Sequence, residues 1–274
     1  MKKKRNSLML FKTLYTILMM LALSVSTTAR AKEYPLDYAV YRNSLSQNEL
    51  TVYSQIYDKA MSFDDSMFSL QVPLSASELD YTMNCFFFDH PELFWLNTSY
   101  RYALNSSQTV IKLQLKFGIS PSDFPNANTL FETKLNHLVY NASLLSTDIE
   151  KEKYIHDYIC SNTAYNVDSP LNQSAYSALT SSYSVCAGYA RAFQLACNKV
   201  GIPCYYVTGT SKGINHAWNI VYIDGMYYNV DLTWDDVIAD NFSKPSYIYF
   251  NKNDAAFAAD HTRSDFAVLL PACN

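Results

Sequence analysis

The first half of the chain alternates between helical and strand-like patterns of hydrophobic residues. Between Ser46 and Met61 the apolar side chains are spaced by one, three or four positions, at Leu50, Tyr53, Ile56, Tyr57 and Ala60. This spacing predicts a helix with one apolar face. Ser75 or Ser77 is placed to cap a second helix toward Phe88. A third helix is expected over about 128–145.

Two strands are predicted between the second and third of these helices, over residues 100–104 and 110–117. In the second strand, Ile111, Leu113, Leu115 and Phe117 alternate with Lys112, Gln114 and Lys116. A period of two is typical of a half-buried strand.

The helices of the second half have clear start and stop signals. Thr147 with Glu150 forms a capping-box pattern for a helix that ends near Asn162. The next helix begins at Cys186. Its apolar stripe continues through Tyr189, Ala190, Phe193, Cys197 and Val200. Gly201 and Pro203 end it.

Strands are expected after this helix. Residues 204–207 read as one strand, and 217–223 and 226–231 read as a hairpin around Asp224-Gly225. Residues 234–236 read as a turn and 246–250 as a strand-like run. Helices mixed with antiparallel strands, without internal repeats, predict an α+β fold.

The N-terminus resembles an export signal. Lys2, Lys3, Lys4 and Arg5 precede an apolar run over 14–25, and Ala29-Arg30-Ala31 has the small-x-small form of a cleavage site. The apolar run is short of the ~20 residues that span a bilayer, which disfavours an uncleaved anchor. We therefore expect residues 1–31 to be a signal peptide, and the mature protein to be secreted or at the cell surface.

Export changes the charge balance. The leader carries six of the 21 basic residues and no acidic ones, so 15 basic residues remain against 25 acidic ones, a net charge of −10. Such a protein is unsuited to bind nucleic acid or an anionic membrane surface. No stable membrane insertion is expected after cleavage.

Six cysteines are spread over the chain, at Cys85, Cys160, Cys186, Cys197, Cys204 and Cys273. In an exported protein they invite a disulfide reading, in which Cys186 pairs with Cys204. There is no CxxC motif, no Cys/His cluster with zinc spacing and no EF-hand pattern. No metal and no cofactor are expected.

Cys186 is a candidate nucleophile because of its place on the predicted helix. The unpaired N–H groups and the positive end of the dipole at a helix N-terminus favour a thiolate. The same N–H groups can face an oxyanion. The alternative is that Cys186 is a small buried residue on an apolar stripe.

The hairpin supplies two partners for such a thiol. With Asp224-Gly225 as its turn, the register brings Trp218 opposite Asp231. His216 points to the same face, so its backbone lies about 7–8 Å from that of Asp231. A carboxylate that orients an imidazole is the third member of a catalytic triad.

The stretches "VCAGYARAF" and "NHAWNIVYIDGMYYNVDLTWDD" resemble the core of the transglutaminase-like superfamily, which has a papain-like thiol fold. The resemblance covers residues 147–236. It implies that Cys186 is the nucleophile, His216 the general base and Asp231 the residue that orients it. "DHPELFWL" is similar to a segment upstream of this core in exported bacterial relatives.

Some positions depart from this family pattern. Relatives often have glycines before the cysteine and a polar residue just after it, where this chain has Ser177, Ser182 and Ala187. These differences concern the oxyanion site and the nearby substrate subsites.

Three further residues are candidates for substrate binding. By position, Gln173 and Tyr183 are candidates for the second oxyanion donor. Trp218 is placed to shield the imidazole, to line a substrate groove or to pack in the core.

These observations predict an N-terminal α/β extension over 32–145 and a catalytic core over 146–274. The expected function is that of an exported thiol enzyme that hydrolyses peptide or amide bonds through an acyl-enzyme. Its partner would be a protein or peptide, such as a cell-wall or surface protein. Two alternatives are a cross-linking transglutaminase, with an amine as acceptor, and an inactive interaction protein of the same fold.

Overall fold

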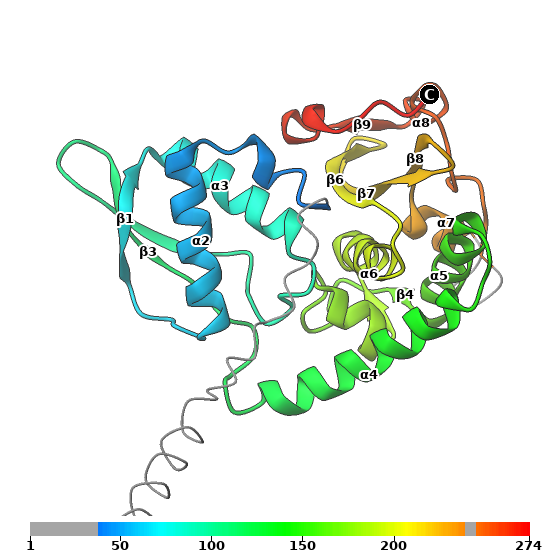
Figure 1. Cartoon of the computed structure of the whole chain (residues 1–274), viewed down its shortest axis with the longest axis horizontal. Coiled ribbons are helices and arrows are strands. Elements are labelled where there is room, and N and C mark those ends of the chain that lie inside the picture. The colour runs from blue at the N-terminus through cyan, green and yellow to red at the C-terminus, as the bar shows by residue number, and fades with distance from the viewer. Residues whose placement is uncertain (1–37, 239–244) are drawn as a thin grey trace, which may run out of the picture. The chain divides into compact units, whose positions relative to one another are not determined.

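The N-terminal half builds a three-stranded sheet under two helices. The computed structural model describes residues 38–238 and 245–274, so the predicted signal peptide lies outside the described residues. A short 3-10 helix, η2 (Arg42–Ser44), leads into α2 (Gln47–Met61). The helices α2 and α3 (Ala76–Asp89) lie beside a sheet with strand order β1-β3-β2 (Figure 1).

All three strands of this sheet are short. Their bounds are Phe68–Leu74 for β1, Arg101–Leu104 for β2 and Val110–Gln114 for β3. The two later strands confirm that strands lie in these two stretches, although both are shorter than predicted. The sequence reading missed β1, although its exposed Ser69, Gln71 and Pro73 alternate with apolar residues in the period of a half-buried strand.

Capping residues set where the helices begin. Ser46 caps α2 and Ser75 caps α3, each in a full capping box. Of the two serines proposed for the second helix, Ser75 is therefore the cap. The third helix, α4 (Phe124–Ser143), starts about one turn earlier than predicted, because Pro125 occupies its first turn.

The second half begins with the capping box predicted at Thr147, which opens α5 (Asp148–Asn162). A loop follows with two short parallel strands, β4 (Ala164–Tyr165) and β5 (Tyr183–Ser184). A π-helical turn, η3 (Ser177–Ser181), lies between them. The next helix, α6 (Cys186–Lys199), begins at the predicted cysteine.

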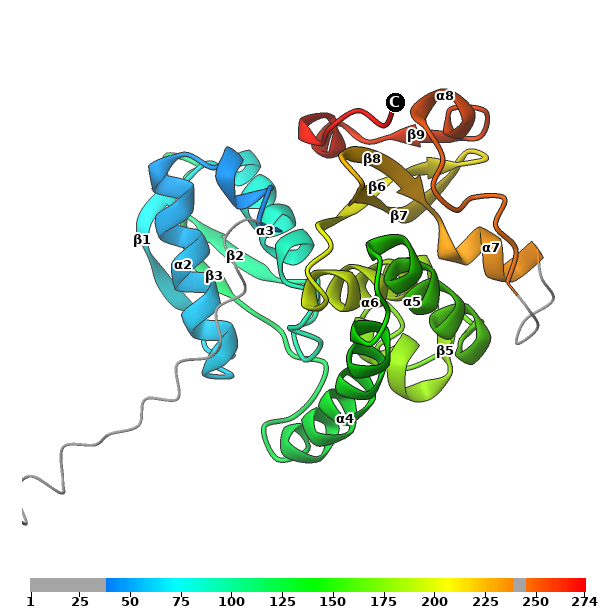
Figure 2. The ribbon, with the colours of Figure 1, turned by 45° about the vertical axis from the view of Figure 1, so that its right-hand side comes forward.

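Helix α6 packs against an antiparallel sheet with strand order β8-β7-β6-β9 (Figure 2). The strands are β6 (Cys204–Ser211), β7 (Ile214–Ile223), β8 (Met226–Val230) and β9 (His261–Arg263). Two helices, α7 (Leu232–Ile238) and α8 (Asp254–Phe257), lie between β8 and β9 in the chain, and the 3-10 helix η4 (Asp265–Leu269) follows β9. Ile223 pairs with Met226 as predicted, and the ladder runs back to Asn219 opposite Val230.

Two predictions about the C-terminal region were wrong. Residues 234–236 are helical, within α7, because the Asp231 carboxylate accepts the backbone N–H groups that open this helix. Residues 246–250 form no strand, since they run irregularly past α7 and are held there by Asp235.

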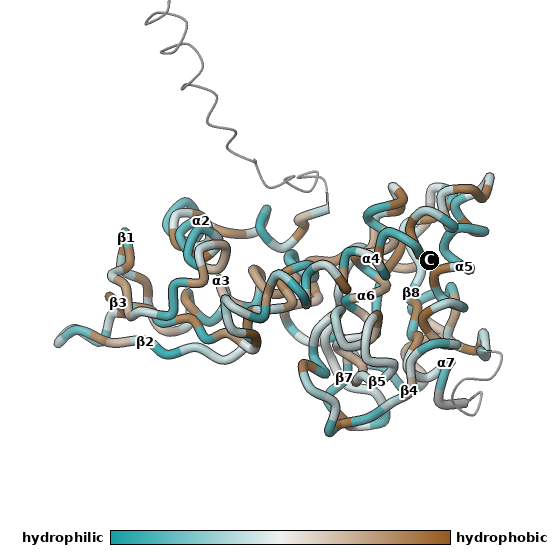
Figure 3. The backbone as a smooth tube through the Cα atoms, turned by 90° about the horizontal axis from the view of Figure 1, so that it is seen from below, coloured by the Kyte–Doolittle hydropathy of each residue, from teal (hydrophilic) through white to brown (hydrophobic). Residues whose placement is uncertain are grey.

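Hydrogen bonds join the first half of the chain to the second. The Tyr41 hydroxyl donates to the Tyr206 carbonyl, at 2.6 Å, and the Gln194 amide donates to the Phe88 carbonyl, at 2.9 Å. Hydrophobic and hydrophilic residues alternate along the helices (Figure 3), as amphipathic elements require. The fold class is α+β, as predicted. Among the described residues, no helix has the length and apolar character needed to cross a membrane.

Candidate active site

Cys186 is the first residue of α6 and follows an extended Val185, with no side-chain cap on the helix. It is the one cysteine among the described residues that is not buried. Gly188, in the same turn, lets a neighbouring loop come close. A Cβ at this position would lie 2.7 Å from the Asn172 carbonyl and 2.8 Å from that of Ser174. The thiol therefore has a partly accessible position at a helix N-terminus.

His216, on β7, meets Asp231, which directly follows β8. The His216 Nε2 lies 2.6 Å from the Asp231 Oδ2. Burial alone would lower the pKa of His216, but the charge and hydrogen bond of Asp231, together with the neighbouring Cys186, raise it to about 10. With Nε2 bonded to the carboxylate, Nδ1 is the ring nitrogen left for the thiol. The structure thus brings the three predicted residues together.

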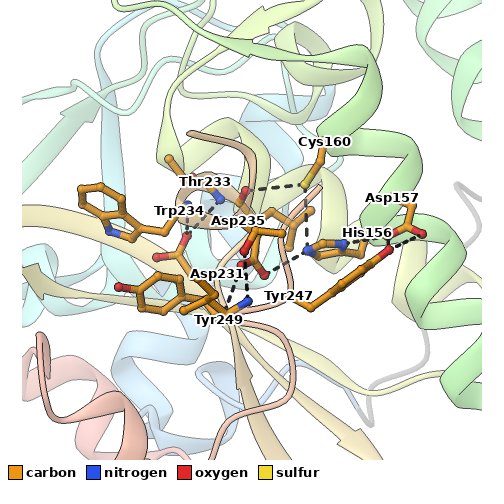
Figure 4. Close-up of polar contacts among 12 residues, drawn as sticks. His156, Asp157, Cys160, Asp231, Thr233, Trp234, Asp235, Tyr247 and Tyr249 are labelled. Atoms are coloured by element: carbon orange, nitrogen blue, oxygen red, sulfur yellow. Dashed lines mark hydrogen bonds and ion pairs between the residues drawn. The ribbon is translucent and has the colours of Figure 1, made fainter. Parts of the chain in front are cut away.

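The Asp231 carboxylate is buried and accepts four hydrogen bonds. Its Oδ1 accepts the backbone N–H groups of Thr233 and Trp234, at 2.9 and 3.2 Å (Figure 4). Its Oδ2 accepts from His216 and from a second imidazole, His261, at 3.0 Å. Burial alone would raise the pKa of Asp231, yet the two histidines hold it below its usual value. Asp231 therefore carries its negative charge inside the protein.

Sequence reasoning did not find His261. This residue lies on β9, which pairs with β6 through Ser211 opposite His261. Nothing in the local pattern around position 261 predicts a partner for Asp231, because the contact depends on how β9 pairs with the sheet.

Trp218 is part of the core beside the site. It is 1% exposed, and its indole N–H donates to the Asn229 side chain. Its ring stacks near the His216 ring, with centroids 6.3 Å apart. Of the three interpretations of Trp218, lining a substrate groove does not fit this burial, whereas packing in the core and shielding the imidazole do.

The two candidate oxyanion donors lie in different surroundings. Tyr183 is exposed on β5, three residues before Cys186. Gln173 lines a cavity of about 210 Å³ that His90 and Arg191 also line and that Cys186 does not. The role of each as a donor stays a prediction.

Tyr165, on β4, is a neighbour of Cys186 that the sequence reading missed. Burial, and next the nearby Cys186, raise the pKa of its hydroxyl. With 43% of its surface exposed, Tyr165 is available to a substrate at this thiol.

A second cysteine, histidine and aspartate lie together inside the core. His156 Nε2 is 3.3 Å from the Asp235 carboxylate and 3.9 Å from the Cys160 sulfur (Figure 4). All three side chains are buried. This cluster links α5 to α7 and has no surface for a substrate.

The cysteines are all free in the structure, so Cys186 is not bridged to Cys204. Cys204 instead lies beside Cys197, whose pKa is raised chiefly by burial and next by this neighbouring thiol.

Three side chains at the site have the donor atoms of a metal centre. The ligand atoms of His216, Asp231 and His261 lie within 4.8 Å of one another. However, the Asp231 carboxylate already accepts hydrogen bonds from four N–H donors, two on each oxygen. The hydrogen bonds alone therefore account for this arrangement of side chains.

Comparison with known proteins finds one family model that matches part of this chain. Residues 137–232 match the model of the transglutaminase-like superfamily. The human and mouse proteins named kyphoscoliosis peptidase are each 30% identical over 137 residues, covering 42% of this chain and 21% of the relative. The aligned segment thus spans about a fifth of the length of these curated relatives.

Solved structures give a looser likeness. A transglutaminase is 16% identical with a TM-score of 0.37, covering 67% of this chain and 53% of the other. A candidate cysteine protease from Cytophaga hutchinsonii is 20% identical with a TM-score of 0.34, covering 49% of this chain and 61% of the other. At these TM-scores the likeness decides nothing about chemistry.

Proposed function

Because residues 137–232 carry a transglutaminase-like core, we propose that this protein is a thiol-dependent acyl-transfer enzyme. Cys186 attacks a peptide or amide carbonyl, His216 takes the thiol proton on Nδ1 and later gives it to the leaving amine, and Asp231 holds the imidazole. The observation that carries the proposal is the 2.6 Å bond between His216 and Asp231 beside a partly exposed thiol.

The surroundings of each group support its role. The N–H groups at the start of α6 face the region where negative charge develops on the carbonyl oxygen. The raised pKa of His216, about 10, favours the imidazolium that must form beside a thiolate. Asp231 stabilises that imidazolium with a buried charge.

Water is the proposed acceptor, which makes the reaction a hydrolysis. An amine wins over water only where the site excludes water and positions the amine. His216 keeps 10% of its side chain exposed and Tyr165 lies open beside Cys186, so the thiol is not enclosed. The similarity to proteins named peptidases points the same way.

The predicted signal peptide extends the proposal to the location and the substrate of the enzyme. With residues 1–31 removed, the enzyme acts outside the cytoplasm on a protein or peptide. The net charge of −10 after cleavage disfavours polyanionic partners.

The test is incubation with a peptide library, with and without a large excess of a labelled primary amine, followed by mass spectrometry. We expect cleaved peptides in both samples and none with Cys186→Ala. Cys197→Ala is a matched control, since that thiol is buried on the same helix.

Two results would contradict the proposal. Covalent incorporation of the amine without cleavage would make the protein a cross-linking enzyme. Cleavage that persists in folded Cys186→Ala would remove Cys186 from the reaction.

A further inference from the structure

We propose that His261 is a positioning residue of the Cys186–His216–Asp231 site. In this view it holds the Asp231 carboxylate in the orientation that places the His216 imidazole for Cys186. The inference rests on the proposed function and adds a fourth residue to its machinery.

The first step is geometric. The His261 Nε2 lies 3.0 Å from the Asp231 Oδ2, the same oxygen that His216 approaches at 2.6 Å. One oxygen that accepts from two rings cannot rotate without losing both bonds. The carboxylate is thereby fixed in the orientation that sets the plane of the His216 ring.

The second step concerns the other nitrogen of His261. Its Nδ1 lies 2.6 Å from the Asp260 Oδ1, and the Tyr249 hydroxyl donates to Oδ2 of the same carboxylate, at 2.6 Å. The His261 ring is thus held by a carboxylate at each of its nitrogens, and its centroid lies 5.7 Å from that of the His216 ring. Asp260 and Tyr249 therefore fix the plane in which His261 approaches Asp231.

The third step is the local environment of His261. Its side chain is fully buried and packs on Phe257, with ring centroids 4.0 Å apart, and on Trp218, at 5.2 Å. The charged and titratable groups that surround it, directly or through Asp260, are Asp231, His216, Asp260, Tyr249 and Lys212. Asp254 and Arg263 line the same cavity as His261. The packed rings leave the His261 imidazole no room to turn away from Asp231.

The consequence concerns the contact at Nε2. Removing it leaves the Asp231 Oδ2 with His216 as its one remaining partner, so the carboxylate can rotate and the His216 ring that it orients is disturbed. A side chain that keeps a donor at this position preserves the orientation.

The experiment measures the rate at which iodoacetamide alkylates Cys186 at pH 7, which needs no substrate. His261→Gln keeps a donor at the position of Nε2, and Asp260→Asn removes the carboxylate that holds Nδ1. We expect His261→Gln to react within about threefold of the wild type and Asp260→Asn to be slowed by about threefold. His137→Gln, on the surface of α4, is the matched control and leaves the rate unchanged.

His261→Phe tests the donor itself. We expect alkylation of Cys186 at pH 7 to slow by about tenfold in a variant that remains folded by circular dichroism. His261→Gln should recover most of that rate, because it restores a donor. A purely structural role for His261 would change the melting temperature and leave the alkylation rate of the folded protein unchanged.

Three outcomes would overturn the proposal. In the first, His261→Gln reacts as slowly as His261→Phe. In the second, His261→Phe reacts as fast as the wild type. In the third, dialysis against EDTA abolishes the reactivity of Cys186 in the wild type, which would mean that a metal holds the carboxylate. Failure to find any cleaved peptide would instead count against the proposed function alone.

Discussion

At the scale of single residues, the site depends on where each polar atom finds its partner. Asp231 is ionised in the interior because four N–H donors converge on its two oxygens. His216 uses one nitrogen for that carboxylate and leaves the other for Cys186. The reactivity of the thiol is thus a property of the cluster.

Selective alkylation of Cys186 is the first expected outcome. Iodoacetamide at neutral pH should modify Cys186 before any other cysteine among the described residues, since the other five are buried. Burial also raises the pKa of Cys85 and of Cys273 to about 12. Peptide mapping after brief labelling checks this, and earlier labelling of Cys160 or Cys204 in folded protein would contradict it.

Asp231→Asn should reduce turnover, or Cys186 alkylation at pH 7, by about 100-fold or more while the fold is retained. An amide would point its own N–H₂ group at two of the four donors and leave both without an acceptor.

Asp235→Asn is the comparison for this substitution. It breaks the buried pair with His156, so it should cost about 3 kcal/mol of unfolding free energy and leave the reactivity of the folded protein within a few-fold. Equal losses of activity in the two variants would contradict the assigned roles.

At the scale of elements, one close approach between strands gives the site its fourth residue. β9 pairs antiparallel with β6, and Gly209 faces Arg263. A Cβ on Gly209 would lie 2.0 Å from the Thr262 carbonyl and 2.7 Å from the Trp218 ring. The absence of a side chain there allows β9 to bring His261 to Asp231.

Gly209→Ala should therefore push β9 away from β6, which costs about 2 kcal/mol of unfolding free energy or more and slows alkylation of Cys186. Gly201→Ala is the control. Its positive φ makes alanine strained, but no atom lies within 4 Å of the added Cβ. It should lower the melting temperature without affecting Cys186. A Gly209→Ala variant with wild-type reactivity would show that β9 adapts.

At the scale of the whole molecule, a buried polar core couples stability to pH. Glu152, on α5, is fully buried with one oxygen bonded to the Asn251 amide and the other without a partner. Burial raises its pKa to about 8, despite the opposing effects of Asn251 and His156. The folded protein therefore keeps a proton that the unfolded chain releases near its ordinary pKa of 4.5.

Because the folded state binds that proton more tightly, its contribution to stability is present at low pH and is lost as pH rises from about 4.5 to about 8. Glu152→Gln should remove this loss. Relative to the wild type, the unfolding free energy of the variant should rise by up to about 4 kcal/mol between pH 5 and pH 8. Urea unfolding at the two pH values measures the difference, with Glu132→Gln on α4 as control. A pH-independent difference would rule out Glu152 as its source.

The sequence alone determined the longer helices and the central hairpin. Local chemistry predicts the capping box at Thr147, a serine cap at 75 or 77, the helix that opens at Cys186 and the Asp224-Gly225 turn, because each depends only on neighbouring residues. The same turn fixed the register that brings His216 to Asp231, because pairing in a two-residue hairpin leaves no freedom.

Only the tertiary structure decided the contacts between segments far apart in the chain. His261 reaches Asp231 across 30 residues of sequence, because β9 adds to the edge of β6 and no local pattern encodes that pairing. The sequence predicted a turn at residues 234–236, whereas the structure has a helix over 232–238. This helix depends on tertiary contacts, because Asp231 caps its N-terminal N–H groups and Asp235 pairs with His156 on α5. Burial of Trp218 was likewise decided by packing, since a strand tryptophan suits a groove or a core equally well until the opposing layer is in place.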